Sequence, residues 1–289
     1  MALCNPLHWL KRAQDEGFAI GAFNANTIEQ AQAIVNAAEA ENAPVFIQVS
    51  HRALQYMGSG NEIVGMQYVA AFGKVAAQSV RVPVALHLDH ATEQEVIMAC
   101  ALGFTSVMFD GSLLSYEENV AITKRLAEIT RSANVCLEAE LGEVPKPHDP
   151  NQLHDVEALT DPEEASAFVN ATGIDTLAVA LGSVHGVQEK QISLDLHRLQ
   201  SIKNRVDIPL VLHGSSGVED VHIQEGIRLG LRKINVATQM NGHFTHAVRK
   251  TLQADEKRSD PRPYLTAGRD AMQAAVQERL RFFGASGKA

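Results

Sequence analysis

The chain has 289 residues, 45% of them hydrophobic and 20% charged, with a formal net charge of −9 at pH 7. This composition predicts a folded globular protein, and its negative charge, with no basic run to offset it, argues against nucleic acid as a partner. The first residues lack the pattern of a secretory leader and no apolar run is long enough to cross a membrane, so we expect a cytoplasmic protein with no membrane partner.

Short apolar strands and amphipathic helices alternate along the chain. The predicted strands are 19–23, 44–49, 83–88, 105–109, 135–138, 176–180, 209–212 and 233–236. The predicted helices are 27–40, 61–79, 92–102, 116–131, one beginning at Asp161, 195–204, 219–228 and 239–252. Each strand and helix together span about 30 residues, the size of a βαβ unit. We therefore expect an α/β protein, a (β/α)8 barrel over residues 1–289, with a doubly wound sheet as the alternative.

The chain continues beyond the eighth predicted unit. Residues 255–264 are rich in charge and proline and are predicted to form a connector or a contact arm. Residues 268–283 have the helical period and are predicted to form an extra amphipathic helix. Residues 255–289 are thus expected to be a C-terminal arm and helix of the same domain.

The third predicted strand ends in an unusual group of side chains, Leu86-His87-Leu88-Asp89-His90. Imidazoles and carboxylates are costly to bury unless they are paired or bind a metal, so this strand end indicates a ligand site. The structural alternative is that Asp89 is the N-cap of the helix beginning near Thr92. That alternative does not explain His90, and on this stretch alone the two interpretations are balanced. His87 shares a strand face with Asp89, which makes it a supporting or spare ligand.

If the chain is a barrel, its catalytic residues lie at the C-terminal ends of the strands. Polar residues gather at those predicted ends: Asn24, Asn26, Ser50, Asp89, His90, Asp110, Glu138, Glu140, His185, His213 and Asn235. Histidines at the third, sixth and seventh ends converge on one mouth, and Zn²⁺ binds such a three-histidine set while keeping a position open for substrate. The three cysteines have no CxxC spacing, so a metal must be held by histidine and carboxylate.

A possible anion site follows the seventh and eighth strands. Residues 214–217 read Gly-Ser-Ser-Gly, and residues 235–238 follow the eighth strand. In barrels of this kind the loops after these two strands commonly bind phosphate. Backbone N–H groups exposed by glycine, together with serine and threonine hydroxyls, suit an anion without a lysine.

These motifs resemble the class II, zinc-dependent ketose-bisphosphate aldolases, the family of fructose- and tagatose-bisphosphate aldolases. The resemblance runs nearly end to end and in the family's order. It is carried by Ala22-Phe23-Asn24, Leu86-His87-Leu88-Asp89-His90, residues 103–112, Glu138-Ala139-Glu140-Leu141-Gly142, His185-Gly186, Leu212-His213-Gly214 and Lys233-Ile234-Asn235-Val236.

The resemblance implies one Zn²⁺ per subunit on His90, His185 and His213, with Glu140 as an alternate metal contact and Asp89 as the acid/base. It also implies that dihydroxyacetone phosphate binds Gly186, Gly214 to Ser216 and Asn235 to Thr238. The substrate-binding set is then Asn24, Ser50, Gly186, Gly214, Ser215, Ser216, Asn235, Val236, Ala237 and Thr238. A homo-oligomer, dimer or tetramer, is expected from the family and the C-terminal arm, and a monovalent cation is a further candidate cofactor.

The implied chemistry is consistent with the residue types. Zinc would act as a Lewis acid on the C2 carbonyl and C3 hydroxyl of a ketose 1-phosphate, while Asp89 takes the C4 hydroxyl proton and the C3–C4 bond breaks. A Schiff-base mechanism needs a lysine at the C-terminal end of a strand. Lys233 is predicted to begin the eighth strand and therefore to lie at the opposite face.

The chain departs from the family after Gly142, where relatives have a Gly-Gly pair and an acidic mobile loop. Residues 143–149 contain two prolines and no glycine, so the segment should be stiffer. The residue that protonates the enediolate is then open among Glu143, His148 and Asp149. The structural alternative is a different surface lid.

Two further departures concern the substrate. Ala237 resembles the tagatose-type branch, since fructose-type members usually have Asp there. Asn241 stands where fructose-type relatives place an Arg for the second phosphate. Either Arg258 or Arg262 in the linker, of the same or a neighbouring subunit, replaces it, or the far end of the substrate carries no phosphate or another anion such as a sulfonate.

Three functions remain open. The first is cleavage of a ketose 1,6-bisphosphate, fructose or tagatose, to dihydroxyacetone phosphate and glyceraldehyde 3-phosphate. The second is the same cleavage of another ketose 1-phosphate. The third is a non-catalytic barrel that binds zinc and phosphate, which the retention of Asp89 beside three histidines argues against.

Overall fold

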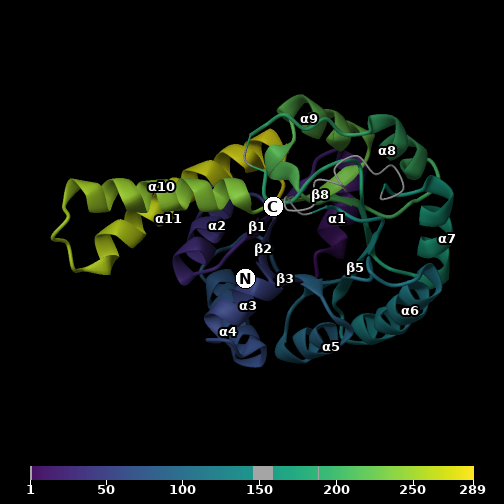
Figure 1. Cartoon of the computed structure of the whole chain (residues 1–289), viewed down its shortest axis with the longest axis horizontal. Helices are drawn as coiled ribbons and strands as arrows, with labels where there is room; N and C mark the ends of the chain where they lie inside the picture. The colour runs from purple at the N-terminus through teal and green to yellow at the C-terminus, as the bar shows by residue number, and fades with distance from the viewer. Residues whose placement is uncertain (1, 146–158, 188) are drawn as a thin grey trace.

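In a computed structural model of the chain, which describes residues 2–145, 159–187 and 189–289, eight parallel strands close into a barrel. The strands follow chain order around the barrel, β1 to β8, and helices lie outside them (Figure 1). Their bounds are β1 (Ile20–Asn24), β2 (Val45–Ser50), β3 (Val84–Ala91), β4 (Ser106–Phe109), β5 (Cys136–Leu141), β6 (Thr176–Val179), β7 (Leu210–Leu212) and β8 (Leu231–Val236). The predicted (β/α)8 barrel is confirmed, and the doubly wound sheet is excluded.

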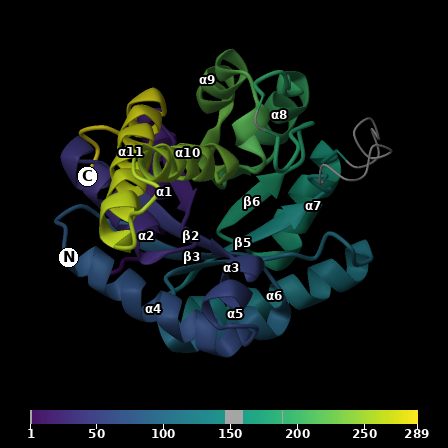
Figure 2. The ribbon, with the colours of Figure 1, turned by 60° about the vertical axis from the view of Figure 1, so that its left-hand side comes forward.

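The helices surround the barrel on all sides. In Figure 2, α4 to α6 lie along one side of it and α8 and α9 along the opposite side. The bounds are α1 (Leu7–Glu16), α2 (Ile28–Glu41), α3 (His51–Met57), α4 (Glu62–Gln78), α5 (Glu93–Leu102), α6 (Tyr116–Ser132), α7 (Pro162–Thr172), α8 (Leu196–Lys203), α9 (Asp220–Leu229), α10 (Thr238–Ala254) and α11 (Pro261–Phe282). Within the described part of the chain, no helix is both long and apolar enough to span a membrane.

Two helices, α1 and α3, do not follow from the sequence patterns above. Each buries only two side chains completely, Leu10 and Ala13 in α1 and Ala53 and Leu54 in α3.

The helix after β3 begins with a cap that settles one of the alternatives for Asp89. Thr92 is the N-cap of α5: its Oγ1 accepts a hydrogen bond from the Glu95 backbone at 3.4 Å, and the Glu95 carboxylate accepts one from the Thr92 backbone at 2.8 Å. This is a complete capping box. Asp89 is therefore not the helix cap, and its carboxylate is available inside the barrel.

The C-terminal arm is a hairpin of α10 and α11 that extends away from the barrel (Figure 1). The two helices pack together, and α11 returns to pack against α2. The predicted bounds of the tail are wrong, because α11 begins at Pro261 with Asp260 as its N-cap, and only residues 255–260 connect the helices. The arm thus includes α10. The Cα of Gly268 lies against Phe244 and Val248, where a Cβ would be 2.9 to 3.0 Å from both side chains.

Gly65 offers a test of how closely α3 and α4 pack. A Cβ at Gly65 would overlap the backbone carbonyl of Leu54, whereas a Cβ at Gly242 on α10 would meet nothing within 4 Å. Gly65→Ala should lower the free energy of unfolding by about 1–3 kcal/mol, because the helices must separate. The control Gly242→Ala should leave it unchanged or raise it by up to about 1 kcal/mol. Urea unfolding of both variants measures the difference, and equal stabilities would show that the helices do not pack this closely.

Candidate active site

Three histidines meet at the C-terminal mouth of the barrel. His90 is the next-to-last residue of β3, and His185 and His213 follow β6 and β7. His90 Nε2 lies 3.2 Å from His213 Nδ1, and the ligand atoms of all three rings are within 4.8 Å of one another. Ligand bonds of about 2.0–2.1 Å in a tetrahedron place donor atoms about 3.3–3.4 Å apart. The predicted trio therefore comes together at a spacing that suits a tetrahedral metal ion.

Carboxylates orient two of these rings. His90 Nδ1 donates to Asp110 at 2.8 Å, and Asp110 is itself held by the backbone and hydroxyl of Ser112. His213 Nε2 donates to Glu138 at 2.8 Å. A carboxylate on one ring nitrogen fixes the tautomer and directs the other lone pair. The free lone pairs of His90 and His213 consequently point to the same position.

The surrounding charges favour a cation at this position. Burial would lower the pKa of His90, but Asp89, Asp110 and Glu140 outweigh it and raise that pKa to about 10. Burial raises the pKa of Glu140 despite the nearby His90 and His213. Among the described residues its Oε2 is buried and has no hydrogen-bond partner. A histidine trio, acidic surroundings and an unpaired buried carboxylate oxygen together fit a divalent metal ion.

Asp89 lies beside the trio and is held by two amides. Gln48 Nε2 donates to one carboxylate oxygen at 3.1 Å, and Asn235 Nδ2 donates to the other at 3.3 Å. Gln48 is in turn fixed by Asn24, whose Oδ1 accepts at 2.9 Å. Burial raises the pKa of Asp89, but His90 and His213 more than offset this and hold it below its usual value. Asp89 is therefore an ionised carboxylate that can accept a proton.

Sequence reasoning missed Gln48. It lies two residues before the end of β2, and a single buried glutamine in an apolar strand carries no motif. The signal was its register: Gln48 is paired with Asn24 in β1 and with His87 in β3. It therefore points into the barrel, as Asn24 and Asp89 do.

A layer of buried charge lies beneath the mouth. Lys233 Nζ is 2.8 Å from Glu138 Oε2 and 3.2 Å from His87 Nε2, and His87 Nδ1 bonds Ser106 Oγ at 2.7 Å. Burial lowers the pKa of His87 to about 3, so this ring is neutral. Both of its nitrogens are occupied, which excludes it as a spare metal ligand.

Two sequence expectations about this layer were wrong. Lys233 does not begin β8, which starts at Leu231; it lies inside the barrel, completely buried. Glu138 is not at the mouth either, because β5 continues to Leu141. The conclusion about Schiff-base chemistry is unaffected, since Lys233 is enclosed and paired with a carboxylate.

The glycine-serine turn after β7 lies next to the start of α10. Gly214 has φ 65°, and a Cβ there would be 2.9 Å from the Val184 backbone, so the close approach of the two loops requires glycine. Ser215 Oγ donates to the Asn235 carbonyl at 2.5 Å, and Ser216 Oγ accepts from the Gln239 backbone at 3.4 Å. The turn and the N-terminus of α10 are thus one continuous unit at the mouth.

Other predicted residues have the following places. Gly186 has φ 76° in the loop after β6, Val236 ends β8, Ala237 is the N-cap of α10 and Thr238 is its first residue. Ser50 ends β2 in register with Asp89, but its hydroxyl also caps α3 by accepting from the Ala53 backbone.

Asn241 belongs to a cluster of neutral amides. Its Oδ1 accepts from Asn26 at 3.1 Å and from Gln30 at 2.9 Å. Of the three candidates in the altered loop, Glu143 is half-buried, and His148 and Asp149 lie outside the described residues.

Comparison with known proteins agrees with this geometry. The family model described as "Fructose-bisphosphate aldolase class-II" matches residues 5–288. The chain belongs to the class II fructose-bisphosphate aldolase family. It is therefore an aldolase, a carbon–carbon lyase, of a family that binds sugar phosphates and is generally metal-dependent.

Relatives of this aldolase cover its whole length. It is 42% identical over 290 residues to the fructose-bisphosphate aldolase of Geobacillus stearothermophilus, covering 100% of this chain and 99% of that one. It is 41% identical to the probable fructose-bisphosphate aldolase of Bacillus subtilis, with 100% of both chains covered. The crystal structure of a putative fructose-1,6-biphosphate aldolase from Coccidioides immitis superposes with a TM-score of 0.83 at 33% identity, over 98% of this chain and 97% of that one.

The buried ion pair predicts a stability effect. Lys233→Met leaves Glu138 charged in the barrel without its lysine partner and should lower the free energy of unfolding by about 3–5 kcal/mol. The double variant Lys233→Met/Glu138→Gln removes both charges and should lose less than the two single losses added together. Urea unfolding measures Lys233→Met, Glu138→Gln and the double variant. If the loss of stability in the double variant equalled the sum of the two single losses, the pairing of Lys233 with Glu138 would be contradicted.

Proposed function

We propose that this aldolase uses Zn²⁺ to cleave a ketose 1,6-bisphosphate reversibly to dihydroxyacetone phosphate and glyceraldehyde 3-phosphate. The observation that carries the proposal is the convergence of three imidazoles beside an ionised carboxylate held by two amides. Fructose 1,6-bisphosphate is the first candidate substrate, because the named relatives are fructose-bisphosphate aldolases. Ala237 keeps tagatose 1,6-bisphosphate as the second.

His90, His185 and His213 would hold the zinc, with Glu140 as an alternate contact through its unpartnered oxygen. When bound, zinc would supply Lewis-acid polarisation of the substrate ketone. Asp110 and Glu138 keep two of the rings in the tautomers that such an ion needs. A monovalent cation remains a prediction.

Asp89 would act as the base. Its carboxylate takes the proton of the C4 hydroxyl as the C3–C4 bond breaks, and returns it in the condensation direction. Gln48 and Asn235 each donate to one oxygen, which fixes the orientation of the carboxylate before substrate arrives. Preorganisation of this kind is what a catalytic base requires and what a binding protein does not, so the non-catalytic barrel is the least supported function.

The phosphate of the dihydroxyacetone half would bind between two backbone turns. The first is Gly214 to Ser216 with Gly186 beside it, and the second is Asn235 to Thr238. Free N–H groups at the start of the 17-residue helix α10 favour an anion. Asn24 and Ser50, which end β1 and β2 between these turns and Asp89, would contact the sugar hydroxyls.

A second candidate substrate differs in the half that is released as the aldehyde. The observation behind it is that Asn241 belongs to a neutral amide cluster with Asn26 and Gln30. This cluster favours a ketose 1-phosphate whose far end is uncharged or carries a sulfonate. For a bisphosphate, Arg258 and Arg262 would supply the charge. Both lie near the far end of the arm, away from their own barrel (Figure 1), so they would act on a neighbouring subunit.

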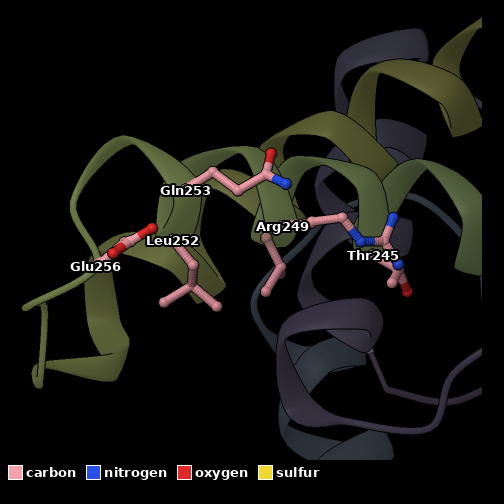
Figure 3. A pocket seen from close by; sticks show the side chains of 6 residues that line it. Thr245, Arg249, Leu252, Gln253 and Glu256 are labelled. Atoms are coloured by element: carbon pink, nitrogen blue, oxygen red, sulfur yellow. The ribbon is translucent and has the colours of Figure 1, made fainter.

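A homo-oligomer is consistent with the arm. Figure 3 shows an open hollow along α10 with Arg249, Leu252, Gln253 and Glu256 along its wall. A helical hairpin that extends from the barrel offers such a surface to a second copy. Whether the assembly is a dimer or a tetramer, and whether the enzyme is cytoplasmic, stay predictions.

A substrate panel tests the proposal directly. Release of dihydroxyacetone phosphate is measured from fructose 1,6-bisphosphate, tagatose 1,6-bisphosphate and other ketose 1-phosphates, with and without EDTA. We expect cleavage of a bisphosphate that EDTA abolishes and added zinc restores. Cleavage of other ketose 1-phosphates alone would select the second candidate. No cleavage of any compound would favour the non-catalytic barrel.

Asp89 can be tested separately from the metal. Asp89→Ala should lower kcat by at least about 100-fold, because no other group replaces the base, while the zinc content per chain is unchanged. Asp89→Asn, which preserves the shape, should be similarly inactive. Elemental analysis and steady-state kinetics on the same preparations separate the two effects. Near-normal turnover of either variant would refute the role of Asp89.

A further inference from the structure

A second group of metal-binding side chains lies at the rim of the barrel, outside the site described above. His51 is the first residue of α3, Glu62 is the first residue of α4, and Glu95 is in the first turn of α5. Their ligand atoms lie within 4.8 Å of one another. His51 directly follows Ser50, the register partner of Asp89, so the cluster adjoins the mouth. None of the three side chains has a part in the proposed aldol chemistry.

Glu95 fixes the state of the His51 ring. Its Oε2 accepts hydrogen bonds from the Thr92 backbone at 2.8 Å and from the Thr92 hydroxyl at 2.9 Å. Its Oε1 is 2.7 Å from His51 Nδ1. The Glu95 side chain is only 10% exposed, so this carboxylate is a rigid acceptor. The Nδ1 atom therefore carries the proton, and the lone pair of a neutral ring is on Nε2.

That lone pair faces a second carboxylate. His51 Nε2 is 3.3 Å from Glu62 Oε1. Gln55 Nε2 lies 3.0 Å from each of these two atoms. Neither Glu62 nor Glu95 has a lysine or arginine partner among the residues that the structure describes. The two acceptors share the Gln55 amide as a donor but, in the described part of the chain, have no lysine or arginine partner, and the local charge is negative.

The separation of these acceptors matches a metal-ligand edge. Two donors of a tetrahedral zinc ion lie about 3.3–3.4 Å apart when each bond is about 2.0–2.1 Å. The distance from His51 Nε2 to Glu62 Oε1 is 3.3 Å, and the corresponding distance from His90 Nε2 to His213 Nδ1 at the mouth is 3.2 Å. A half-turn of the Gln55 amide would place its oxygen beside both acceptors in place of its nitrogen.

The geometry points to a second site for Zn²⁺ or a similar divalent ion at the rim, with His51 Nε2 and Glu62 Oε1 as ligands. When the Gln55 side-chain amide makes this half-turn, its oxygen becomes the third protein ligand, and water takes the remaining coordination position. Glu95 orients the histidine, as carboxylates do for metal-bound imidazoles. Because the His51 and Glu62 side chains are 37% and 38% exposed, water competes for the ligands, and this site binds zinc more weakly than the three-histidine site.

Equilibrium dialysis against a series of buffered free zinc concentrations, with elemental analysis of zinc per chain, tests the proposal. The wild-type enzyme should bind two zinc ions, the second at the higher concentration. His51→Gln should lose the second zinc ion and keep the first. Glu62→Gln should lower the affinity for the second zinc ion by at least about tenfold. His197→Gln, which changes an exposed histidine on α8, is the matched control and should bind two.

The test is independent of catalysis. His185→Ala should lose the tighter ion and keep the weaker, which assigns each event to its site whatever the substrate proves to be. Circular dichroism verifies that each variant is folded. Binding of one ion to the wild type, or an unchanged second event in His51→Gln, would overturn the proposal. Either outcome would mean that His51 Nε2 and Glu62 do not hold a metal ion.

Discussion

The candidate site depends on one buried ion pair, Lys233 with Glu138. An ammonium and a carboxylate inside a closed barrel are stable only when each compensates the other and their remaining hydrogen-bonding capacity is satisfied. Here Lys233 also contacts His87, and the second oxygen of Glu138 accepts from His213. The carboxylate that neutralises the lysine is thus the same one that orients a ring of the histidine trio. Loss of the pair would disturb both the core and the mouth.

The alternation of side chains along a strand explains why the buried charges and the candidate site residues form two layers inside the barrel. Residues two apart on a strand point to the same side and are about 6.6 Å apart along it. Three strands each place one residue in the lower layer and one in the upper: His87 and Asp89 on β3, Glu138 and Glu140 on β5, and Lys233 and Asn235 on β8. The lower layer is closed and fully paired. The upper layer keeps acceptors free for a metal and a substrate.

The upper of these two layers could be predicted from the sequence better than the lower one. The barrel followed from eight repeats of strand and helix, and the histidine trio followed from its position after three strands. The strand bounds were less accurate, because β5 and β8 continue beyond the apolar runs that define a strand in the sequence. Because the predicted strand bounds were wrong by two or three residues, Glu138 was expected at the mouth and Lys233 at the opposite face of the barrel, whereas both lie inside it. A buried pair across the barrel cannot be found from either strand alone.

Other parts of the molecule depend on contacts that sequence patterns do not carry. Gln48 acquires its role only through the register of β1, β2 and β3, which places its amide between Asn24 and Asp89. The arm is similar: α11 begins at Pro261, because Asp260 caps it and Pro at the first position is compatible with a helix start. A proline-rich, charged segment resembles a linker until its neighbours are known.

The distribution of charge at the mouth limits how a phosphorylated sugar can bind. Asp89, Asp110 and Glu140 are acidic, and the neighbouring side chains Asn24, Asn235 and Asn241 are neutral. A phosphate that enters this surface must be compensated by something other than the side chains around it. Under the proposed function, the metal ion and N–H groups of the two backbone turns would do so on the dihydroxyacetone side. The amide cluster of Asn26, Gln30 and Asn241 provides hydrogen bonds but no charge, so under the same proposal substrates would be discriminated on the aldehyde side.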